Sequence, residues 1–511
     1  MTSSHSLSSK GHDLTEASKQ KPLRILIGVD TFPPDINGAA RFAERLAGGL
    51  VRHGHDVHIV AAAYKKEHGS FKEVHDDSLM TVHRLKSYRV PTHANLRWVN
   101  PFGLQRKMQR LLDEVKPDAV HLQSHVLIGR FLAKAAKNRR IRLLATNHFM
   151  PENLVRYMLI IPKFMEKAFT RWAWRDVSRI LKLAEVVTTP TRKAAELLEA
   201  STSIRGALAI SCGIDASKFS NSAPPSNKQP RILFVGRLDF EKQLHNLLSA
   251  VALLPKELNV EVELVGDGSE RHRLENQAFE LGIRENVIFS GHISDAELPL
   301  AYERATVFAM PSIAELQSIA TMEAMASGRP VVAADAMALP HLVHDGDNGY
   351  LFPPDDVEVF ADRLKRVLTA SPDELERLSE NSLHLIRAHD IERTLTIFEG
   401  LYRGDAAAPK TSDDNSADYE APIGRLSESL HEQILTFRQR AAEMRDRSTG
   451  VRKRIWGMGD GVAERLDDLR VDVAERIDDL KLEVAEKARQ VDKKVRGSVR
   501  KATDKLKRDE E

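Results

Sequence analysis

Residues Glu315-Leu-Gln-Ser-Ile-Ala-Thr-Met-Glu323 place two carboxylates eight positions apart at the expected start of a helix. The apolar run Ala305-Thr-Val-Phe-Ala-Met and a Pro-Ser turn precede them, and Gly328-Arg-Pro-Val-Val-Ala begins the next strand. The first carboxylate falls in the turn and the second about two helical turns further along, so both can face one cleft. This order of strand, turn, helix and strand predicts an α/β unit.

The start of the same helix is a place where phosphate can bind. The first backbone N–H groups of a helix lack partners within it, and this end of the helix dipole is positive. A phosphate between two carboxylates suits a nucleotide-sugar, because one carboxylate can hold the ribose hydroxyls and the other the sugar hydroxyls. The segment therefore indicates a nucleotide-sugar site.

Apolar strands and helical segments alternate through most of the chain. In the first half, strands are expected at 24–29, 56–61, 118–122, 143–146 and 186–189, with an amphipathic helix at 40–53. In the second half they are expected at 231–236, 260–266, 287–291, 307–310 and 331–334. This alternation predicts two parallel, doubly wound sheets. Residues 221–230, rich in Ser, Pro and Asn, predict a linker between them.

Length and composition limit the class of protein. At 511 residues the chain is too long for one ordinary domain, and its 42% hydrophobic content supports substantial cores. The single cysteine, Cys212, fits a reducing cytosol, and we interpret it as a buried structural thiol. No run of 18 apolar residues is present, so no membrane-spanning helix is expected. Residues 1–21 lack an apolar core and predict a disordered tail rather than a signal peptide.

The C-terminal part of the chain has a different pattern. Residues 405–423 are poor in apolar residues and predict a flexible tether. In the extension that follows, 424–511, an 11-residue repeat begins at Val462 and sets a narrow apolar stripe along a long helix. Its polar face is acidic up to Glu483 and basic from Val484 to Arg508. A helix lying on a membrane, a coiled coil that joins copies of the chain, and a solvated single helix are the three alternatives.

Four further sequence segments, taken in their order along the chain, indicate a protein family. They are Phe32-Pro-Pro-Asp-Ile-Asn-Gly38, Gly236-Arg-Leu-Asp-Phe-Glu-Lys242, Val265-Gly-Asp-Gly-Ser269 and Gly346-Asp-Asn-Gly349-Tyr-Leu-Phe. Together with Glu315 and Glu323, they resemble the retaining glycosyltransferases of family 4 over residues 22–405. The resemblance implies an α/β protein of the GT-B fold, in which two Rossmann-like domains face a cleft. It implies an acceptor domain at 22–220, a nucleotide-sugar domain at 221–389 and a helix at 390–404 that crosses back to the first domain.

The resemblance also implies roles for residues of the donor site. Arg237 and Lys242 would hold the donor diphosphate and stabilise the charge that grows on it as the sugar leaves. Glu323 would bind the ribose hydroxyls, and Glu315 the sugar hydroxyls. The remaining donor-binding residues would be Gly38, Leu316, Gln317, Ser318 and Ile293, the last through backbone groups near the base. The chain departs from the family at Gln243, where Gly is frequent, and at Gly38, which stands without a second glycine beside it.

Three histidines are candidates near the transferred sugar. His148 matches the family's histidine at the end of a strand in the first domain, between donor and acceptor. His121 and His125 lie on the preceding strand and its loop and are placed at the acceptor pocket, with a structural role as the alternative. The family implies retention of the anomeric configuration. No side chain is placed as a nucleophile, which favours a front-face route in which the leaving phosphate takes the acceptor's proton. No metal-ligand cluster is visible, and no cofactor beyond the nucleotide-sugar substrate is expected.

Two basic and aromatic segments of the first domain bear on the acceptor. From Ser78 to Leu112 there is no acidic residue, and Arg97 and Trp98 are among the seven basic and three aromatic side chains. Further on, four basic residues recur every fourth position from Lys163 to Arg175, next to four aromatic ones. They are Lys163, Lys167, Arg171 and Arg175, beside Phe164, Phe169, Trp172 and Trp174. Such surfaces suit an anionic bilayer. The alternative is a basic helix whose aromatic residues pack on its own domain.

These patterns together predict a cytoplasmic glycosyltransferase, peripheral on the inner face of the cell membrane. It would move a hexose from a UDP- or GDP-sugar to an acceptor, preferably a membrane glycerolipid. A soluble sugar or small metabolite is the second acceptor. From other classes, a GT-B-fold sugar-nucleotide epimerase and an inactive scaffold are the alternatives. Nothing resembles a nucleic-acid recognition module, so nucleic acid is not an expected partner.

Overall fold

The computed structural model describes residues 21–35, 37–64, 66–90, 93–152, 165–219 and 229–405. Nearly all of the N-terminal tail, the linker and the tether therefore lies outside the described residues, as do the whole 11-residue repeat, Lys163 and Phe164. The alternatives for the repeat remain predictions. Among the described residues, no helix combines the length and the apolar character needed to cross a bilayer.

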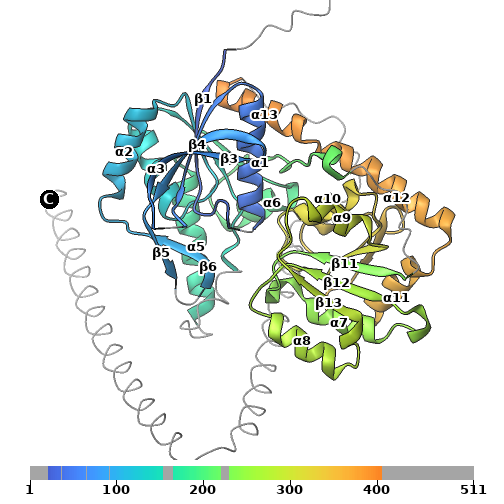
Figure 1. Cartoon of the computed structure of the whole chain (residues 1–511). Coiled ribbons are helices and arrows are strands. Elements are labelled where there is room, and N and C mark those ends of the chain that lie inside the picture. The colour runs from blue at the N-terminus through green and yellow to red at the C-terminus, as the bar shows by residue number, and fades with distance from the viewer. Residues whose placement is uncertain are drawn as a thin grey trace, which may run out of the picture. The chain divides into compact units, whose positions relative to one another are not determined.

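The first domain is built on an eight-stranded sheet (Figure 1). Its strands, in spatial order, are β10 (Leu208–Ala209), β9 (Val186–Thr189), β8 (Arg142–Thr146), β7 (Ala119–Leu122), β1 (Arg24–Gly28), β2 (Asp56–Ala62), β4 (Ser78–Leu85) and β3 (Gly69–His75). All neighbouring strands are parallel except β3 and β4. β7 is buried along its whole length, as is typical of a central parallel strand covered on both faces.

The second domain is built on a six-stranded, wholly parallel sheet. The strands lie in the order β13 (Val287–Gly291), β12 (Glu261–Val265), β11 (Arg231–Val235), β14 (Val307–Met310), β15 (Val331–Ala334) and β16 (Gly349–Phe352). The ten strands predicted from apolar runs are all present in the two sheets. The predicted pair of doubly wound sheets is thus confirmed.

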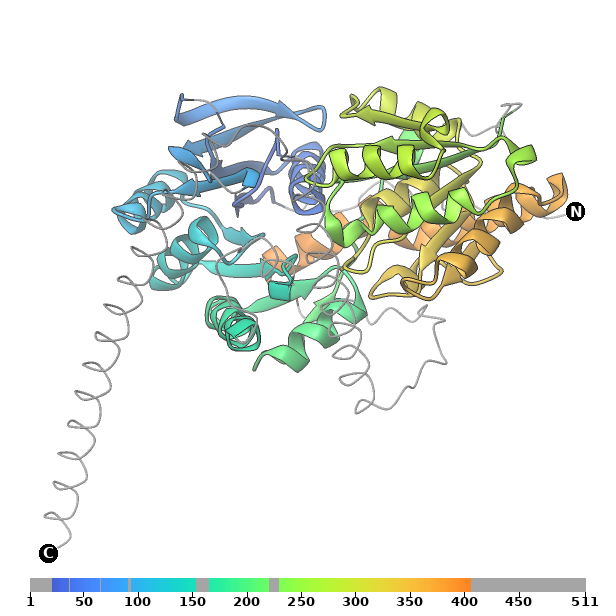
Figure 2. The ribbon, with the colours of Figure 1, turned by 90° about the horizontal axis from the view of Figure 1, so that it is seen from below.

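Helices cover both faces of each sheet (Figures 1 and 2). Those of the first domain are α1 (Gly38–Arg52), α2 (Leu104–Val115), α3 (Leu127–Asn138), α5 (Glu166–Leu181) and α6 (Arg192–Ser201). Those of the second are α7 (Leu244–Ala252), α8 (Arg271–Glu280), α9 (Glu297–Glu303), α10 (Ile319–Ala326), α11 (Val357–Leu368) and α12 (Pro372–Ile386), before α13 (Ile391–Arg403). Short 3₁₀ helices are η2 (Ala216–Phe219), η3 (Phe240–Lys242), η4 (Lys256–Leu258), η5 (Arg284–Asn286), η6 (Leu339–His341) and η7 (Arg387–His389).

The last helix, α13, packs against α1 and β8 of the first domain, and Figure 1 shows it beside α1. Gly49 of α1 makes room for Leu395, because a Cβ at Gly49 would come within 2.5 Å of the Leu395 side chain. The Tyr402 hydroxyl also lies 2.7 Å from Nδ1 of His121, which is on β7. The chain thus finishes the core of its first domain after it has built the second.

The two passages of the chain between the domains lie side by side. Ile214, after β10, forms an isolated parallel bridge with Asp390, just before α13. The Ile214 N–H donates to the His389 carbonyl at 2.8 Å, and the Ile391 N–H donates to the Ile214 carbonyl at 3.1 Å. The ring of Phe219 then packs on Tyr302 of the second domain. The first passage is therefore near residue 215, a few residues before the expected boundary at 220.

Cys212 lies at this crossing and is 4% exposed. Burial raises the pKa of its thiol to about 12, so the thiol stays protonated at neutral pH. The interpretation of Cys212 as a buried structural cysteine is confirmed.

Two strand pairs were not predicted. β3 and β4 form an antiparallel hairpin whose turn residues, Asp76 and Asp77, both have positive φ angles of 44° and 57°. β3 is largely exposed at the sheet edge, so it lacks the apolar run that marks the other strands. β5 (Ser87–Val90) and β6 (His93–Val99) form a separate two-stranded sheet inside the basic segment 78–112.

Candidate functional site

Lys242 and Glu315 meet at the carboxyl end of the second sheet. Lys242 ends η3, shortly after β11, and Glu315 lies in the loop between β14 and α10. The Lys242 ammonium group forms an ion pair with the Glu315 carboxylate, and Glu315 is only 8% exposed. The structure thus brings together two residues predicted to hold the diphosphate and the donor sugar.

Arg237 lies on the first loop of the same domain, directly after β11. Its guanidinium contacts Asp239 at 2.5 Å and Glu241 at 2.8 Å. The loop is held close to the next one, because a Cβ at Gly266 would lie 1.9 Å from the Gly236 carbonyl oxygen. The glycines of both motifs therefore let two strand-end loops pack backbone to backbone, and this contact sets the position of Arg237.

Glu323 lies one helical turn inside α10, where it is 4% exposed. The Tyr302 hydroxyl donates to Glu323 Oε2 at 2.9 Å, and Nη2 of Arg45 donates to Oε1 at 2.5 Å. Burial and the neighbouring Glu323 carboxylate raise the pKa of Tyr302 well above its usual value, so the phenol keeps its proton. Both carboxylate oxygens are thereby oriented.

The N-termini of α1 and α10 approach each other. Ser318 caps α10 by accepting from the Thr321 N–H, and Asn37 caps α1 by accepting from the Ala40 N–H. A Cβ at Gly38, the first residue of α1, would lie 3.9 Å from Cδ1 of Ile319, the first residue of α10. Two positive helix ends at one place favour an anion such as a diphosphate.

The neighbours of Glu315 have structural partners. Gln317 accepts from the Cys212 N–H at 2.7 Å and donates to Ser211 Oγ at 3.0 Å. The Leu316 carbonyl accepts from the Thr191 hydroxyl at 2.8 Å. These bonds join the loop to the crossing and to the first domain. The Gln317 side chain therefore holds the loop, and its predicted role in binding the donor stays a prediction.

Ile293 follows β13 and packs partly buried against the core of its domain. Gly291, two residues before it, has a φ of 66° and accepts from the Gly266 N–H at 2.7 Å. The loop of Ile293 is thus bonded to the second glycine-containing loop, at the same sheet edge as Arg237.

His148 follows β8 in the first domain. Its Nε2 lies 2.8 Å from Gln123 Oε1, and its ring packs on Phe42 of α1 at 5.2 Å between centroids. Because an amide oxygen only accepts, Nε2 carries the hydrogen and Nδ1 keeps a free lone pair. Burial lowers the pKa of His148 to about 4, so the imidazole is neutral at pH 7.

His121 lies in the core, which contradicts its predicted place at the acceptor pocket, whereas the place of His125 stays a prediction. His121 is fully buried, and its two ring nitrogens lie 2.7 Å from the Tyr402 hydroxyl and from Thr146 Oγ1. His125 is 7% exposed and packs on Phe149 at 4.7 Å. Burial lowers the pKa of His121 to about 3 and that of His125 to about 4. Both imidazoles are therefore neutral at pH 7, and His121 is a structural residue.

The basic and aromatic segments are only partly outward-facing. On α5, Trp172 is 59% exposed beside the exposed Arg171 and Arg175, whereas Trp174 is 4% exposed and donates to Glu152 at 2.9 Å. The predicted aromatic ridge is therefore wrong for Trp174.

The β5–β6 hairpin likewise has one exposed and one inward-facing side chain of the predicted pair. Trp98 is 43% exposed and packs on Tyr88 across the hairpin. Arg97 turns inward to Ser87 Oγ at 2.7 Å and lies over the Tyr64 ring. One side chain of the predicted pair thus supports the hairpin, and the other remains at the surface.

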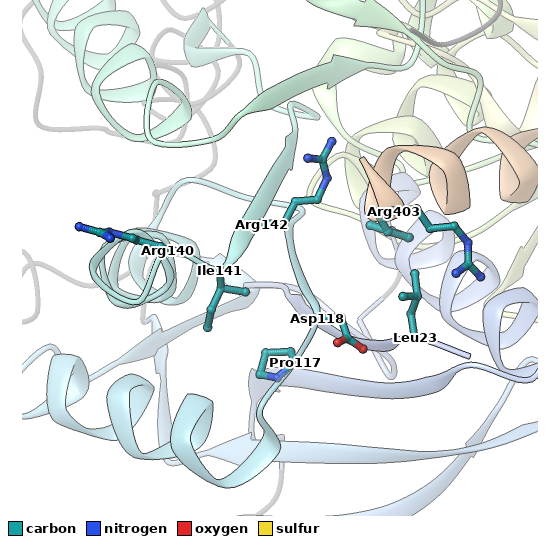
Figure 3. A pocket seen from close by; sticks show the side chains of 8 residues that line it. Leu23, Pro117, Asp118, Arg140, Ile141, Arg142 and Arg403 are labelled. Atoms are coloured by element: carbon teal, nitrogen blue, oxygen red, sulfur yellow. The ribbon is translucent and has the colours of Figure 1, made fainter. Parts of the chain in front are cut away.

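A pocket of about 680 Å³ lies elsewhere, at the amino ends of the first domain's strands (Figure 3). Leu23, Asp118 and Arg142 line it from the starts of β1, β7 and β8, together with Arg403 of α13. Ligands of doubly wound sheets bind outside the carboxyl ends of the strands. This pocket is therefore on the opposite edge from His148 and is not part of the candidate site.

Several residues of the site were missed from the sequence. Gln123 orients His148, Tyr302 orients Glu323, and Arg45 reaches Glu323 from the other domain. Arg45 and Glu323 are 278 residues apart in the sequence, so no local sequence pattern links them. Gln123 lies two residues after His121 at the end of a strand. This position is the sequence feature from which its place in the site could have been predicted.

Comparisons with known proteins agree with this architecture. Residues 36–218 match the family model described as Glycosyltransferase Family 4, and residues 215–384 match that described as Glycosyl transferases group 1. An alpha-monoglucosyldiacylglycerol synthase of Streptococcus pneumoniae is 26% identical over 74% of this chain and 85% of its own length. A GDP-mannose-dependent alpha-mannosyltransferase of Mycolicibacterium smegmatis is 28% identical over 79% of this chain and 99% of its own.

Among solved structures, HepE of Anabaena in complex with UDP and glucose superimposes with a TM-score of 0.59. It is 19% identical, and the match covers 75% of this chain and all of that one. At this identity the likeness concerns the fold, which is GT-B. Because family models match residues 36–218 and 215–384, the chain belongs to glycosyltransferase family 4.

Proposed function

We propose that this protein is a retaining hexosyltransferase that takes its sugar from a UDP- or GDP-sugar and transfers it to a membrane glycerolipid. The observation that carries the proposal is the arrangement of Lys242 and Glu315 beside the N-terminus of α10, with Glu323 buried behind it. It offers two carboxylates and a helix dipole from one loop and helix, and a cation from the neighbouring loop after β11.

The donor would bind with its diphosphate at the ends of α1 and α10. Arg237 and Lys242 stabilise the negative charge that develops on the leaving diphosphate, and the two helix N-termini add to this effect. Glu323 accepts hydrogen bonds from the ribose hydroxyls, and Glu315 from the hexose hydroxyls. Lys242, freed from Glu315, then faces the phosphate.

The transfer step needs no protein nucleophile. The bond between the anomeric carbon and the phosphate oxygen breaks while the acceptor oxygen approaches the same face of the sugar. The proton of the acceptor hydroxyl passes to the leaving phosphate oxygen. Neutral His148, with its free Nδ1 lone pair, can hold a sugar hydroxyl near this centre. Closure of the domains would keep water away from the reacting carbon.

A lipid acceptor is supported by two surface features of the first domain. Trp172 on α5 and Trp98 on β6 are exposed, and basic side chains accompany Trp172. Exposed aromatic and basic side chains bind at the headgroup level of anionic bilayers. One of the relatives is named for a glucosyldiacylglycerol, and the other for GDP-mannose. We accordingly place the protein on the cytoplasmic face of the membrane as a peripheral enzyme.

The test is a transfer assay with the full chain. UDP-glucose, UDP-galactose and GDP-mannose are each supplied with anionic vesicles that contain diacylglycerol, and products are identified by mass spectrometry. The expected result is one glycosylated lipid, with an anomer matching that of the donor. A Glu323→Ala variant should form none. Transfer only to soluble sugars would overturn the lipid acceptor, an inverted anomer would overturn retention, and no turnover of any sugar nucleotide would overturn the enzyme.

A further inference from the structure

Helix α1 of the first domain reaches the nucleotide-sugar domain through two arginines one turn apart. Arg41 forms a bidentate ion pair with Asp295, which lies in the loop after β13. Arg45 donates through Nη2 to Oε1 of Glu323 on α10. The two arginines differ in exposure, because the Arg41 side chain is 29% exposed and that of Arg45 only 16%.

The second terminal nitrogen of Arg45 has no partner. Among the described residues, Nη1 of Arg45 is buried and makes no hydrogen bond. A buried guanidinium N–H normally finds an acceptor, and an exception calls for an explanation. Asp295 is already bonded to both terminal nitrogens of Arg41. Arg45 therefore presents one used and one unused donor beside the carboxylate of Glu323.

A hydroxyl group is the ligand that fits this pair of groups. Glu323 can accept a hydrogen bond, and Nη1 of Arg45 can donate one, side by side. A hydroxyl both donates and accepts, so one hydroxyl can satisfy both partners at once. A bond from a charged donor is also stronger than one between neutral groups. A phosphate oxygen would satisfy Arg45 but would be repelled by Glu323.

We propose that Arg45 is a ribose-recognising residue, which the acceptor domain contributes to the donor site. Nη2 orients Glu323, and Nη1 donates to the oxygen of the same ribose hydroxyl whose hydrogen Glu323 accepts. The inference rests on the proposed binding of ribose by Glu323. It adds that selection of ribose over deoxyribose requires both domains, so recognition of the nucleotide is complete only when α1 lies against α10.

The test compares the dissociation constants of ribo- and deoxynucleotides. UDP and GDP are measured against the full chain by calorimetry, each beside its 2′-deoxy and 3′-deoxy forms. The wild type should lose about tenfold to hundredfold in affinity for the form that lacks the recognised hydroxyl, the range for a hydrogen bond to a charged group. In Arg45→Ala the ribonucleotide should bind as weakly as that deoxy form, with little further loss for the deoxy form itself.

Two further variants separate this role from a merely structural one. Arg41→Ala removes the neighbouring interdomain ion pair, and it should leave the preference for the ribonucleotide intact. Arg45→Lys keeps the charge but has one nitrogen, so it should retain part of the affinity and lose most of the preference. The Arg45→Lys variant also allows the preference for ribonucleotides to be measured if Arg45→Ala does not fold.

The outcomes are distinguishable. If Arg45→Ala weakens ribo- and deoxynucleotides by the same factor, Arg45 contacts the phosphates and the inference is overturned. If the preference survives in both Arg45 variants, it is also overturned, while the proposed donor site stands. If the wild type binds neither UDP nor GDP, the proposed function itself has failed.

Discussion

The ammonium group of Lys242 is paired with the carboxylate of Glu315, 73 residues further along the chain. The two groups have different expected partners, one the diphosphate and the other the hexose. A donor that binds between them must replace one ion pair by two new interactions. The pair thus keeps both side chains in place, and neither charge is left uncompensated in a largely buried loop.

Replacing Lys242 with alanine should lower kcat more than it raises the donor KM. The growing charge on the leaving diphosphate is present mainly in the transition state, so the loss of one fixed cation costs about 10²- to 10³-fold in kcat. Steady-state kinetics with the accepted sugar nucleotide would measure this. Lys256→Ala, at an exposed position after α7, is the matched control and should be unchanged. A variant with full kcat would contradict the assigned role of Lys242.

His121 should make the free energy of unfolding fall as the pH is lowered. Its pKa is lowered to about 3 by burial, from an ordinary value of about 6.5. Since the folded state holds the ring neutral, the unfolded state binds a proton first as the pH falls. The stabilisation is complete above about pH 6.5 and is lost progressively down to about pH 3.

The expected loss from His121 alone is about 2 kcal/mol between pH 7 and pH 5. Urea denaturation at the two pH values would measure it. His121→Gln, which cannot titrate and can still bond Tyr402 and Thr146, should show a correspondingly smaller drop. Equal drops in both proteins would show that His121 titrates normally in the folded state.

The exposed face of α5 should contribute to membrane binding. Replacing both Arg171 and Arg175 with glutamine removes two charges worth about 1 kcal/mol each near an anionic surface, or roughly thirtyfold in partition coefficient. Sedimentation of the full chain with anionic vesicles would measure it, and the effect should shrink at high salt. Phe279→Ala, at a position 77% exposed on α8, is the surface control. Unchanged sedimentation of the double variant would argue against α5 as the docking face.

Gly266 should be intolerant of any side chain. It has a φ of 129°, and a Cβ there would lie 1.9 Å from the Gly236 carbonyl oxygen. Gly266→Ala should therefore destabilise the fold by more than about 3 kcal/mol, or move the Arg237 loop and weaken donor binding. Gly282 is the matched control, since its φ of 68° is also positive but nothing lies within 4 Å of its Cβ. Gly282→Ala should cost only about 1 kcal/mol. Similar melting temperatures for the two variants would contradict the close loop contact.

The features that could be predicted from the sequence are those that leave a local pattern of apolar and polar residues. The central parallel strands are buried on both faces, so they appear as apolar runs and were found. β3 is exposed at the edge of its sheet and carries no such run. Trp172 and Trp174 are two positions apart, which places them on opposite sides of a helix, and only one of them is exposed. The helical period thus already argued against a single aromatic ridge.

The residues of the candidate site also fall into two groups, those that local sequence patterns reveal and those that depend on distant contacts. Residues that belong to one loop and one helix, such as Glu315 and Glu323, were found together because their spacing is local. Arg45 was not found, since its contact with Glu323 depends on how two domains meet. His121 was misplaced because a strand end can direct a side chain either into the cleft or into the core. The Tyr402 hydroxyl, 281 residues away, is what holds the ring in the core.

The bridge between Ile214 and Asp390 has a mechanical consequence. Two connections that are hydrogen-bonded side by side resist bending in the plane that contains both, and they bend more easily out of that plane. We therefore expect the two domains to move relative to each other mainly by this one hinge rotation. Such a hinge would return α1 to the same register against α10 at each closure.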